Sequence, residues 1–549
     1  MERLLEKLAI WRNPIFRRYC RSRLRFKGAL VWYLLVVIVA TFVVSLTYVL
    51  MVNSNVPPEA AARRLWFPLL MIQGLILMMK GTGVVSAGII QDKIDQTQDY
   101  QRLTPLSPAH CLIGYLCGLP ILELAMFALT LPHLAFIVSV GHIPLDVLLS
   151  VYTAFFVCVT LYYVTAIAVG IVMNRWLLGY LLAIFMVVVI NVVLPLSVSQ
   201  LGLKFVQFLS VWPVISQKLL PLTGLPGVPV NTSGNPFFSM DSDVYIYNAR
   251  VSPFVFTLLL QSSLILTFFV MAYRRWQSAT KHSLSKPYAI AFLAGFVVLV
   301  LGNVWPAITG RFLPFQIFGQ TDLNQLSEVI AIAFPAVYCI VSWCLAGVLM
   351  AIVTPSHHSC VRGIRRALKL GHTAPRAWED DSSNMFFTGL LIVVVMAGFL
   401  VLYYTLSGAG FFEFRAGAEL GMWRLPVALA LVLVYTMMLL QVMELKPTVL
   451  VILLVWFVPV LVAVVLGAAF QQATTAHAVI ASISPIALVI MASAVPMIDF
   501  VPVDAEAQAQ FQQILTGSIT GIAFVTTQIV FLAARWRNHT RRFAQITRV

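Results

Sequence analysis

Residues 29–53 read ALVWYLLVVIVATFVVSLTYVLMVN, an apolar stretch that contains no charged side chain. An α-helix rises 1.5 Å per residue, so a helix of this length spans the roughly 30 Å hydrocarbon core of a bilayer. Similar stretches recur along the chain, whose 549 residues are 60% hydrophobic and only 10% charged. A soluble domain carries about 25% charged residues, so the sequence predicts a protein that crosses the membrane many times.

The apolar stretches are numerous enough for about twelve crossings. They fall at about 29–53, 66–89, 110–138, 146–173, 177–198, 252–273, 287–307, 327–353, 385–405, 426–444, 448–470 and 512–534. A further apolar stretch, 479–499, contains Pro485 and Pro496, and we expect a re-entrant or interfacial segment on the outer side. The predicted fold class is all-α, a polytopic membrane helix bundle with about 12 transmembrane helices.

Lys and Arg side chains are concentrated on one side of this arrangement. With the N-terminus in the cytoplasm, 27 of the 36 basic residues fall in cytoplasmic segments and 8 fall in outer loops. Cytoplasmic loops are enriched in Lys and Arg, so this asymmetry predicts that both termini are cytoplasmic. The net charge of +15 is dispersed among the spans, which favours a role in orientation and argues against nucleic-acid binding.

Two similar six-span halves, 29–286 and 287–549, organise the chain. Each half has a long outer excursion before its last span and a basic tail after that span. A six-plus-six duplication of this kind is common among transporters. The preceding segment, 1–28, alternates apolar residues with many arginines, so we expect a helix in the inner interface, with a solvated basic arm as the alternative.

Two cytoplasmic segments are candidates for contact with a soluble partner. Residues 90–108 are polar, rich in acids, and end in a Pro-punctuated turn before the third span. Such a segment can form a small helix that is joined rigidly to two spans; an ordinary connecting loop is the alternative. The basic loop 354–384 takes the same place in the second half, either as a second docking surface or as a product of the charge rule alone.

Two charges lie inside predicted spans, Lys80 in the second and Glu123 in the third. Counting from the cytoplasmic ends of these spans gives depths of about 15 and 20 Å, so an ion pair across adjacent helices is feasible. A bare charge at that depth costs at least a few kcal/mol, so each needs a partner or water. We favour a structural pair that fixes helix register over a pathway or gate.

The cytoplasmic segments resemble those of the membrane subunits of ABC-2-type ABC transporters. Asn13-Pro14-Ile15, followed by Arg21-Ser22-Arg23-Leu24-Arg25, resembles the Arg-rich start of that family. The run Leu103-Thr104-Pro105-Leu106-Ser107-Pro108 matches the ending of a motif that follows the family's second span, and Asp92, Thr97 and Asp99 match positions before it. The chain departs from the family at Ile94, Gln96 and Gln98, where Glu, Gly and Leu are usual.

The resemblance implies the permease subunit of an ATP-driven exporter, an efflux system of the plasma membrane, here a bacterial cytoplasmic membrane. The residues that it implies for coupling are Asp92, Asp95, Thr97, Asp99, Arg102, Thr104 and Pro105. The sequence has no G-x-x-x-x-G-K-[ST] phosphate loop, so ATP and Mg²⁺ are expected on a separate ABC ATP-binding subunit. No catalytic, cofactor or metal site is expected on this chain itself.

The other partners implied are the lipid bilayer, a second copy of the chain or a second permease, and a transported substrate that no residue defines. Two other functions stay open. A self-contained secondary transporter with a six-plus-six repeat would place Lys80 and Glu123 near its transport site. A multi-span membrane transferase would carry an acidic, metal-requiring activity in the excursion 199–251.

Overall fold

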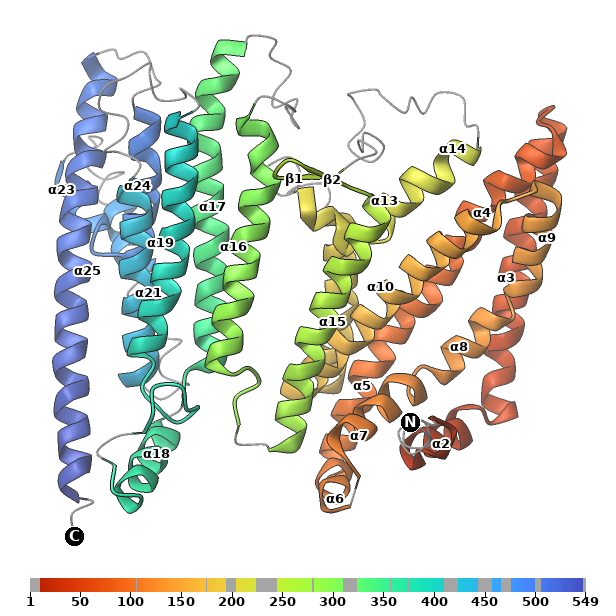
Figure 1. Ribbon diagram of the computed structural model, residues 1–549, viewed down its shortest axis with the longest axis horizontal. Coiled ribbons are helices and arrows are strands. Elements are labelled where there is room, and N and C mark those ends of the chain that lie inside the picture. The colour runs from red at the N-terminus through yellow and green to blue at the C-terminus, as the bar shows by residue number, and fades with distance from the viewer. Residues whose placement is uncertain are drawn as a thin grey trace. The chain divides into compact units, whose positions relative to one another are not determined.

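The computed structural model describes most of the chain as helix, with one small hairpin. The described residues are 10–104, 106–173, 175–193, 204–223, 244–278, 281–309, 323–355, 357–372, 375–408, 423–442, 457–465, 475–498 and 505–546. The chain divides into two compact units, Met1–Ser283 and Leu284–Val549 (Figure 1). This division lies close to the boundary between residues 286 and 287 that the sequence suggests.

Unit 1 is a helix bundle, and most of its elements are joined by connections of a few residues. They are η1 (Ile10–Arg12), α2 (Pro14–Arg23), α3 (Phe26–Asn53), α4 (Pro58–Gly74), η2 (Leu75–Gly81), α5 (Thr82–Ile94), α6 (Thr97–Leu103), α7 (Pro108–Gly118), α8 (Ile121–Ala128), α9 (Leu131–Gly141), α10 (Leu145–Val172), α11 (Trp176–Val188), η3 (Val189–Val193), η5 (Lys204–Leu209), α13 (Trp212–Val214), η6 (Ile215–Leu219), α14 (Leu220–Thr223), β1 (Val244–Ile246), β2 (Ala249–Val251) and α15 (Pro253–Gln277). The two strands pair antiparallel, with Tyr245 opposite Arg250.

The second predicted span forms part of one continuous helical run, Pro58–Ile94. Its middle segment, η2, is π-helical. A π-helical turn holds more residues than an α-helical turn and therefore redirects the side chains around it, and such turns are frequent at functional sites. Lys80 lies in this segment.

The third predicted span, 110–138, is broken into α7, α8 and α9 in the structure. Pro120 has no backbone N–H to donate, so the helix ends at Gly118 and the chain turns before α8 begins. A second turn at Leu129 and Thr130 separates α8 from α9. The third predicted span is therefore not one continuous helix, and its membrane-length run is Ile121–Gly141.

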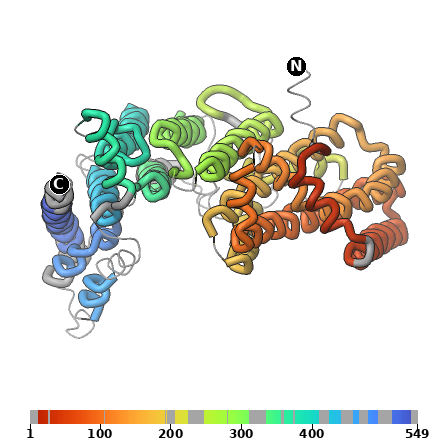
Figure 2. Tube along the Cα trace, turned by 90° about the horizontal axis from the view of Figure 1, so that it is seen from below, coloured from red at the N-terminus to blue at the C-terminus, as the bar shows by residue number. Residues whose placement is uncertain are grey.

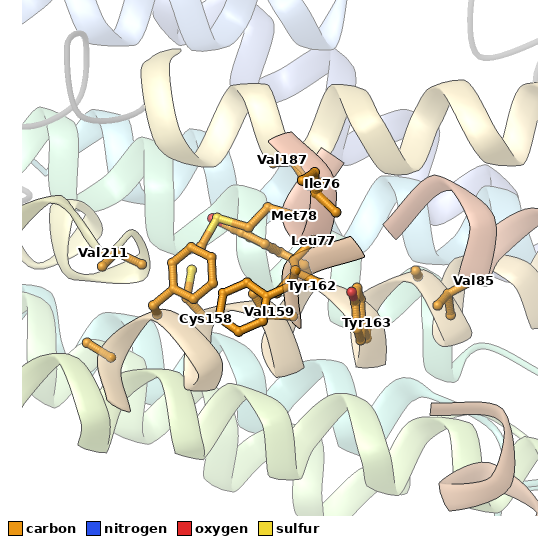
Figure 3. Packing of buried hydrophobic residues seen from close by; sticks show 14 of the residues in the cluster. Ile76, Leu77, Met78, Val85, Cys158, Val159, Tyr162, Tyr163, Val187 and Val211 are labelled. Carbon is orange, nitrogen blue, oxygen red and sulfur yellow. The ribbon is translucent and has the colours of Figure 1, made fainter. Parts of the chain in front are cut away.

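The core of unit 1 lies around α10, which packs against α5 on one side and α15 on another. Figure 3 shows Cys158, Val159 and Tyr162 of α10 beside Leu77 and Met78 of η2, all of them buried. Helices in membranes approach closely where small residues lie at their interface. Gly170 of α10 is such a position, because a Cβ there would lie 3.0 Å from Ile89 and 3.1 Å from the Ser86 carbonyl oxygen.

Unit 2 is a second helix bundle. Its elements are α16 (Lys286–Ile308), α17 (Leu323–Val353), α18 (His357–Lys369), α19 (Met385–Gly408), α21 (Arg424–Val442), α23 (Thr475–Ala481), α24 (Pro485–Ile498) and α25 (Ala505–Ile546). Within it, α16 packs against α17 and α19, and α25 packs against α21, α23 and α24. The short helix α18 and the C-terminal end of α25 lie at the same end of the unit (Figure 1).

Nine helices in the described part of the chain are long and apolar enough to cross a membrane. Two shorter apolar helices, Trp176–Asn191 and Arg424–Leu440, coincide with the fifth and tenth predicted spans. The eleventh, 448–470, is described only over residues 457–465, which are helical. The protein is thus a helical, multi-pass membrane protein.

The apolar stretch 479–499 does not form one membrane-length helix in its described part. It comprises the end of α23, a turn, and α24. The 14 residues of α24 span about 21 Å, less than the hydrocarbon thickness of a bilayer. Both short helices pack against α25.

Candidate functional site

One end of unit 1, the basal end, gathers α2, α6, the start of α7, and the C-terminal ends of α5, α10 and α15 (Figures 1 and 2). Lys93 Nζ, near the end of α5, donates to the carbonyl oxygens of Ile171 (3.0 Å) and Met173 (3.2 Å) at the end of α10. The Arg102 guanidinium of α6 donates to the Arg275 carbonyl oxygen of α15 at 3.5 Å. Segments that are far apart in sequence are therefore tied together at this end.

The opposite end of unit 1 is held by two arginines of α4. Arg63 Nε donates to the Gly141 carbonyl oxygen at 2.7 Å, and Arg64 Nε donates to the Thr223 carbonyl oxygen at 3.0 Å. These acceptors are the last residues of α9 and α14. Connections that the charge pattern assigns to opposite membrane sides thus lie at opposite ends of unit 1.

Asp92 is the centre of a polar network at the basal end. Its side chain is only 5% exposed, and its carboxylate accepts hydrogen bonds from the hydroxyls of Tyr19 and Tyr115, both at 2.6 Å. The Arg18 guanidinium completes the network at 3.1 Å. Because Asp92 belongs to α5 while its partners belong to α2 and α7, one carboxylate joins three helices.

The pKa of Tyr19 and the N-cap of α2 support the attachment of α2 at this end. Burial and the Asp92 carboxylate raise the pKa of Tyr19, which keeps its hydroxyl protonated and donating. Asn13 starts α2 as its N-cap, because its side-chain oxygen accepts from the Ile15 backbone N–H at 2.9 Å. The amide nitrogen of Asn13 also donates to the His110 carbonyl oxygen at 2.7 Å, so the cap itself attaches α2 to α7.

The short helix α6 is fixed to its neighbours by two buried glutamines. Gln98 Nε2 donates to the Ile89 carbonyl oxygen of α5 at 3.1 Å. Gln101 Oε1 lies 3.0 Å from the Tyr115 hydroxyl of α7, whose one proton is shared between this oxygen and the closer Asp92 carboxylate. Between α5 and α6, Gln96 has a φ of 57°, a left-handed conformation that glycine adopts without steric cost.

The other predicted coupling residues lie on the surface of the α5–α6 turn or at its edge. Asp99 pairs with Arg102 at 2.9 Å, and Asp95 is exposed and accepts from Gln91. Thr97 is the half-buried first residue of α6, and Thr104 donates to the Gln101 carbonyl oxygen. Pro105 lies outside the described residues.

Sequence reasoning missed the apolar part of this surface. Tyr100 is 71% exposed, Leu103 is 85% exposed, and Ile94 is 52% exposed. The available signal was the presence of large apolar residues in an otherwise polar segment. The structure places them on the outside of the turn, beside the exposed carboxylates of Asp95 and Asp99.

Lys80 and Glu123 are brought together, with Nζ 3.5 Å from Oε1. Arg23, from the end of α2, lies 3.9 Å from the other Glu123 oxygen. Lys80 Nζ also lies 3.6 Å from the centre of the Trp32 ring of α3, a cation–π contact. Glu123 is fully buried, and the turn at Pro120 allows α8 to begin next to α2.

Sequence reasoning found two members of this group, Lys80 and Glu123, and missed Arg23 and Trp32. The helix α2 contributes Arg23 because its apolar face packs on α7, with Ile15 and Phe16 buried. A helix that only rested on lipid would not have been oriented in this way. We call Arg23, Trp32, Lys80 and Glu123 the charge cluster.

In unit 2, the loop 354–384 is organised around Lys286, whose side chain is fully buried. Its Nζ donates to Ser382 Oγ at 2.6 Å and to the carbonyl oxygens of Ser382, Ala377 and Ser383 at 3.0 to 3.4 Å. On the outside of the same loop, Arg366 of α18 pairs with Glu379 and Asp381. The basic and acidic halves of the loop sequence thus face each other.

Among the described residues, no group of three or more His, Cys, Asp or Glu side chains is arranged to hold a metal ion. Comparison of the chain with models of known protein families, with characterised proteins and with solved structures found no match. The assignment of function therefore depends on the chemistry of the basal end and the charge cluster.

Proposed function

We propose that this chain is the permease subunit of an ATP-driven exporter of the ABC-2 type. A separate ATP-binding subunit docks on the turn that runs from α5 through α6 to α7, and it carries the ATP and Mg²⁺. The observation that supports this proposal is the Asp92 network, which makes the turn part of a rigid frame. The resemblance of Leu103–Pro108 to the family's motif supports the choice of partner, and the distribution of Lys and Arg supports a cytoplasmic basal end.

A force applied to α6 acts on several helices at once. Gln98 connects α6 to α5, Gln101 connects it to α7, and Arg102 connects it to α15. Leaving one buried polar partner unsatisfied costs about 1–3 kcal/mol, so these connections resist bending of the turn. Movement of the partner is therefore passed to the spans rather than absorbed by the loop.

The exposed face of the turn has the composition of a docking surface. Tyr100 and Leu103 present apolar side chains that are 71% and 85% exposed. Aromatic side chains that fill a partner's pocket contribute most of the binding energy in protein interfaces. Asp95 and Asp99 add negative charge beside them, which matches a partner groove with basic residues.

The proposal is tested by purifying the tagged full chain from native membranes and identifying bound chains by mass spectrometry. We expect a co-purifying protein that contains a G-x-x-x-x-G-K-[ST] loop. The double variant Tyr100→Ala, Leu103→Asp should reduce the amount bound about tenfold or more, because it removes both apolar anchors. Tyr404→Ala is the matched control, since Tyr404 of α19 is 67% exposed and lies in unit 2.

Two results would contradict the proposal. In the first, no phosphate-loop protein is retained by the wild-type chain. In the second, the double variant retains as much of it as the Tyr404→Ala control does. Either result would remove α6 as the place where an ATPase acts on this chain.

A second candidate function is a self-contained secondary transporter, and the charge cluster favours it. Buried ionisable groups within spans are frequent at ion and proton pathways. The two functions are separated by reconstituting the purified chain alone in liposomes. Transport that is driven by an ion gradient without any ATPase would select the secondary transporter, whereas transport that needs an added ATPase and ATP would select the exporter.

A further inference from the structure

The charge cluster contains more positive than negative charge. Two cations, Arg23 and Lys80, share the single carboxylate of Glu123. Within the described residues, Glu123 is the one carboxylate that lies within 4.0 Å of either cation. The cluster therefore keeps a net charge of about +1 next to apolar surface, where an unbalanced charge is costly.

The carboxylate and the cations differ in how far they are exposed. The Glu123 side chain is 1% exposed, whereas the side chains of Lys80 and Arg23 are 24% and 27% exposed. In the described part of the chain, Lys80 and Arg23 are the side chains that supply positive charge to the two oxygens of Glu123, and neither oxygen has a shorter hydrogen bond. Glu123 thus attracts both cations from the protein interior, while the exposed parts of Lys80 and Arg23 can contact another anion.

The open side of the cluster lies along the apolar surface of α3. Trp32 is 43% exposed, and its neighbours Val31 and Leu35 are 66% and 50% exposed. Arg23 precedes α3, and Trp32 lies six residues after α3 begins, about 9 Å along the helix. The cluster therefore lies nearer the end of this membrane-length helix than the depths of about 15 and 20 Å, which were counted along unbroken spans. Tryptophan is enriched at this level of membrane proteins, where the ring meets both headgroups and acyl chains.

We propose that Arg23, Lys80 and Trp32 form a binding site for the headgroup phosphate of an anionic phospholipid. The guanidinium of Arg23 can donate two parallel hydrogen bonds to a phosphate, and the ammonium of Lys80 supplies a second positive charge. The acyl chains then lie along the exposed face of α3. Basic pockets between spans on the cytoplasmic side are known to hold such headgroups.

An anionic phospholipid fits this site better than other occupants. A zwitterionic lipid would bring its positive choline group to a cluster that already has surplus positive charge. A soluble phosphate would gain nothing from the apolar surface of α3, whereas acyl chains would cover it. The site does not depend on the proposed coupling to an ATPase, because none of its residues belongs to α6.

The test is native mass spectrometry of the full chain released from nanodiscs that contain equal parts of phosphatidylcholine and phosphatidylglycerol. We expect the wild-type chain to retain phosphatidylglycerol in preference. Arg23→Gln should lower this preference about fivefold, the effect of one cation near a membrane surface. Arg23→Lys keeps the positive charge and should retain much of the preference for phosphatidylglycerol. Arg21→Gln removes an exposed charge from the same helix and should leave this preference unchanged.

A variant that strengthens the preference for phosphatidylglycerol shows that the effect comes from binding, because a damaged fold would only weaken that preference. Glu123→Gln raises the surplus charge of the cluster and should strengthen retention of phosphatidylglycerol, which misfolding would not do. Equal retention of the two lipids by the wild-type chain overturns the proposal, as does an equal effect of Arg23→Gln and Arg21→Gln. Inorganic phosphate at millimolar concentration is added to the chain in nanodiscs of phosphatidylcholine alone. If it raises the thermal unfolding temperature as much as phosphatidylglycerol does, the site binds a soluble anion and the proposal of a lipid site is overturned.

Discussion

Gln96 adopts a backbone conformation that is unfavourable for its residue type. Its φ of 57° lies in the left-handed region, where the Cβ atom of any residue other than glycine crowds the following carbonyl oxygen. The conformation is needed because the chain must reverse from α5 into α6 within two residues. The hydrogen bonds of Gln98 and Gln101 then hold the turn closed and compensate for the strain.

The variant Gln96→Gly should therefore stabilise the protein. Removing the crowded Cβ should raise the free energy of unfolding by about 1 kcal/mol, measured as an increase in the thermal unfolding temperature of the detergent-purified chain. Gln91→Gly is the matched control, because Gln91 is exposed and lies within the helix α5. There glycine should destabilise by about 1 kcal/mol. Destabilisation by both variants would show that Gln96 is not strained.

At the scale of elements, α2 is a helix that connects other helices of unit 1 through side-chain contacts. We call it the connecting helix. Its start is attached to α7 through Asn13, its middle to α5 through Arg18 and Tyr19, and its end to the charge cluster through Arg23. Amphipathic helices that rest on lipid bury their apolar face in the membrane. Here that face packs on protein, so the connecting helix can fix the positions of α5, α7 and α8 relative to one another.

Asp92→Asn should weaken the attachment of the connecting helix α2 to α5. The change removes the charge that pairs with Arg18 and places an amide nitrogen where two hydroxyls donate, so we expect a loss of about 2–3 kcal/mol in the free energy of unfolding. Limited trypsin digestion should also cut at the arginines of α2 faster in this variant. Asp95→Asn is the control, since Asp95 is exposed and should change stability by less than about 0.5 kcal/mol. If Asp92→Asn digests no faster than Asp95→Asn, the attachment of the connecting helix does not depend on this carboxylate.

At the scale of the whole molecule, the proposed orientation places α6 in the cytoplasm and the turn before α4 outside. Cysteines introduced as Tyr100→Cys and Asn55→Cys report on these two positions, because both residues are exposed. A membrane-impermeant maleimide should label Asn55→Cys in intact cells and Tyr100→Cys only in inside-out vesicles. The wild-type chain, with its seven native cysteines, supplies the background. Labelling of Tyr100→Cys in intact cells would reverse the orientation.

The features that could be predicted from the sequence are those that neighbouring residues determine. An apolar span is set by consecutive side chains, so nine membrane-length helices appear where spans were expected in the described part of the chain. The meeting of Lys80 with Glu123 followed from counting residues along two adjacent spans. Arg23 and Trp32 could not be added to that pair, because their positions depend on the turn at Pro120 and on the packing of α2.

Unit 2 contains a contact that no local pattern indicates. Lys286 reaches the loop near Ser382, 96 residues further along the chain. A lysine at the start of an apolar helix is usually assigned to the membrane surface, with its ammonium in water. The structure instead buries the ammonium among the Ser382 hydroxyl and nearby carbonyl oxygens of the loop, and Lys286 reaches these acceptors where α16 packs on α19.

Three carbonyl oxygens and a serine hydroxyl accept from the Lys286 ammonium, and carbonyl oxygens are also the groups that bind dissolved potassium ions in channels. In this protein the cation is covalently attached to the helix that it stabilises. It cannot be washed out, exchanged for sodium or lost when the cell's ionic composition changes. The part of the loop around Ser382 is therefore held by a group of the chain itself, and this contact is linked to the packing of α16 on α19.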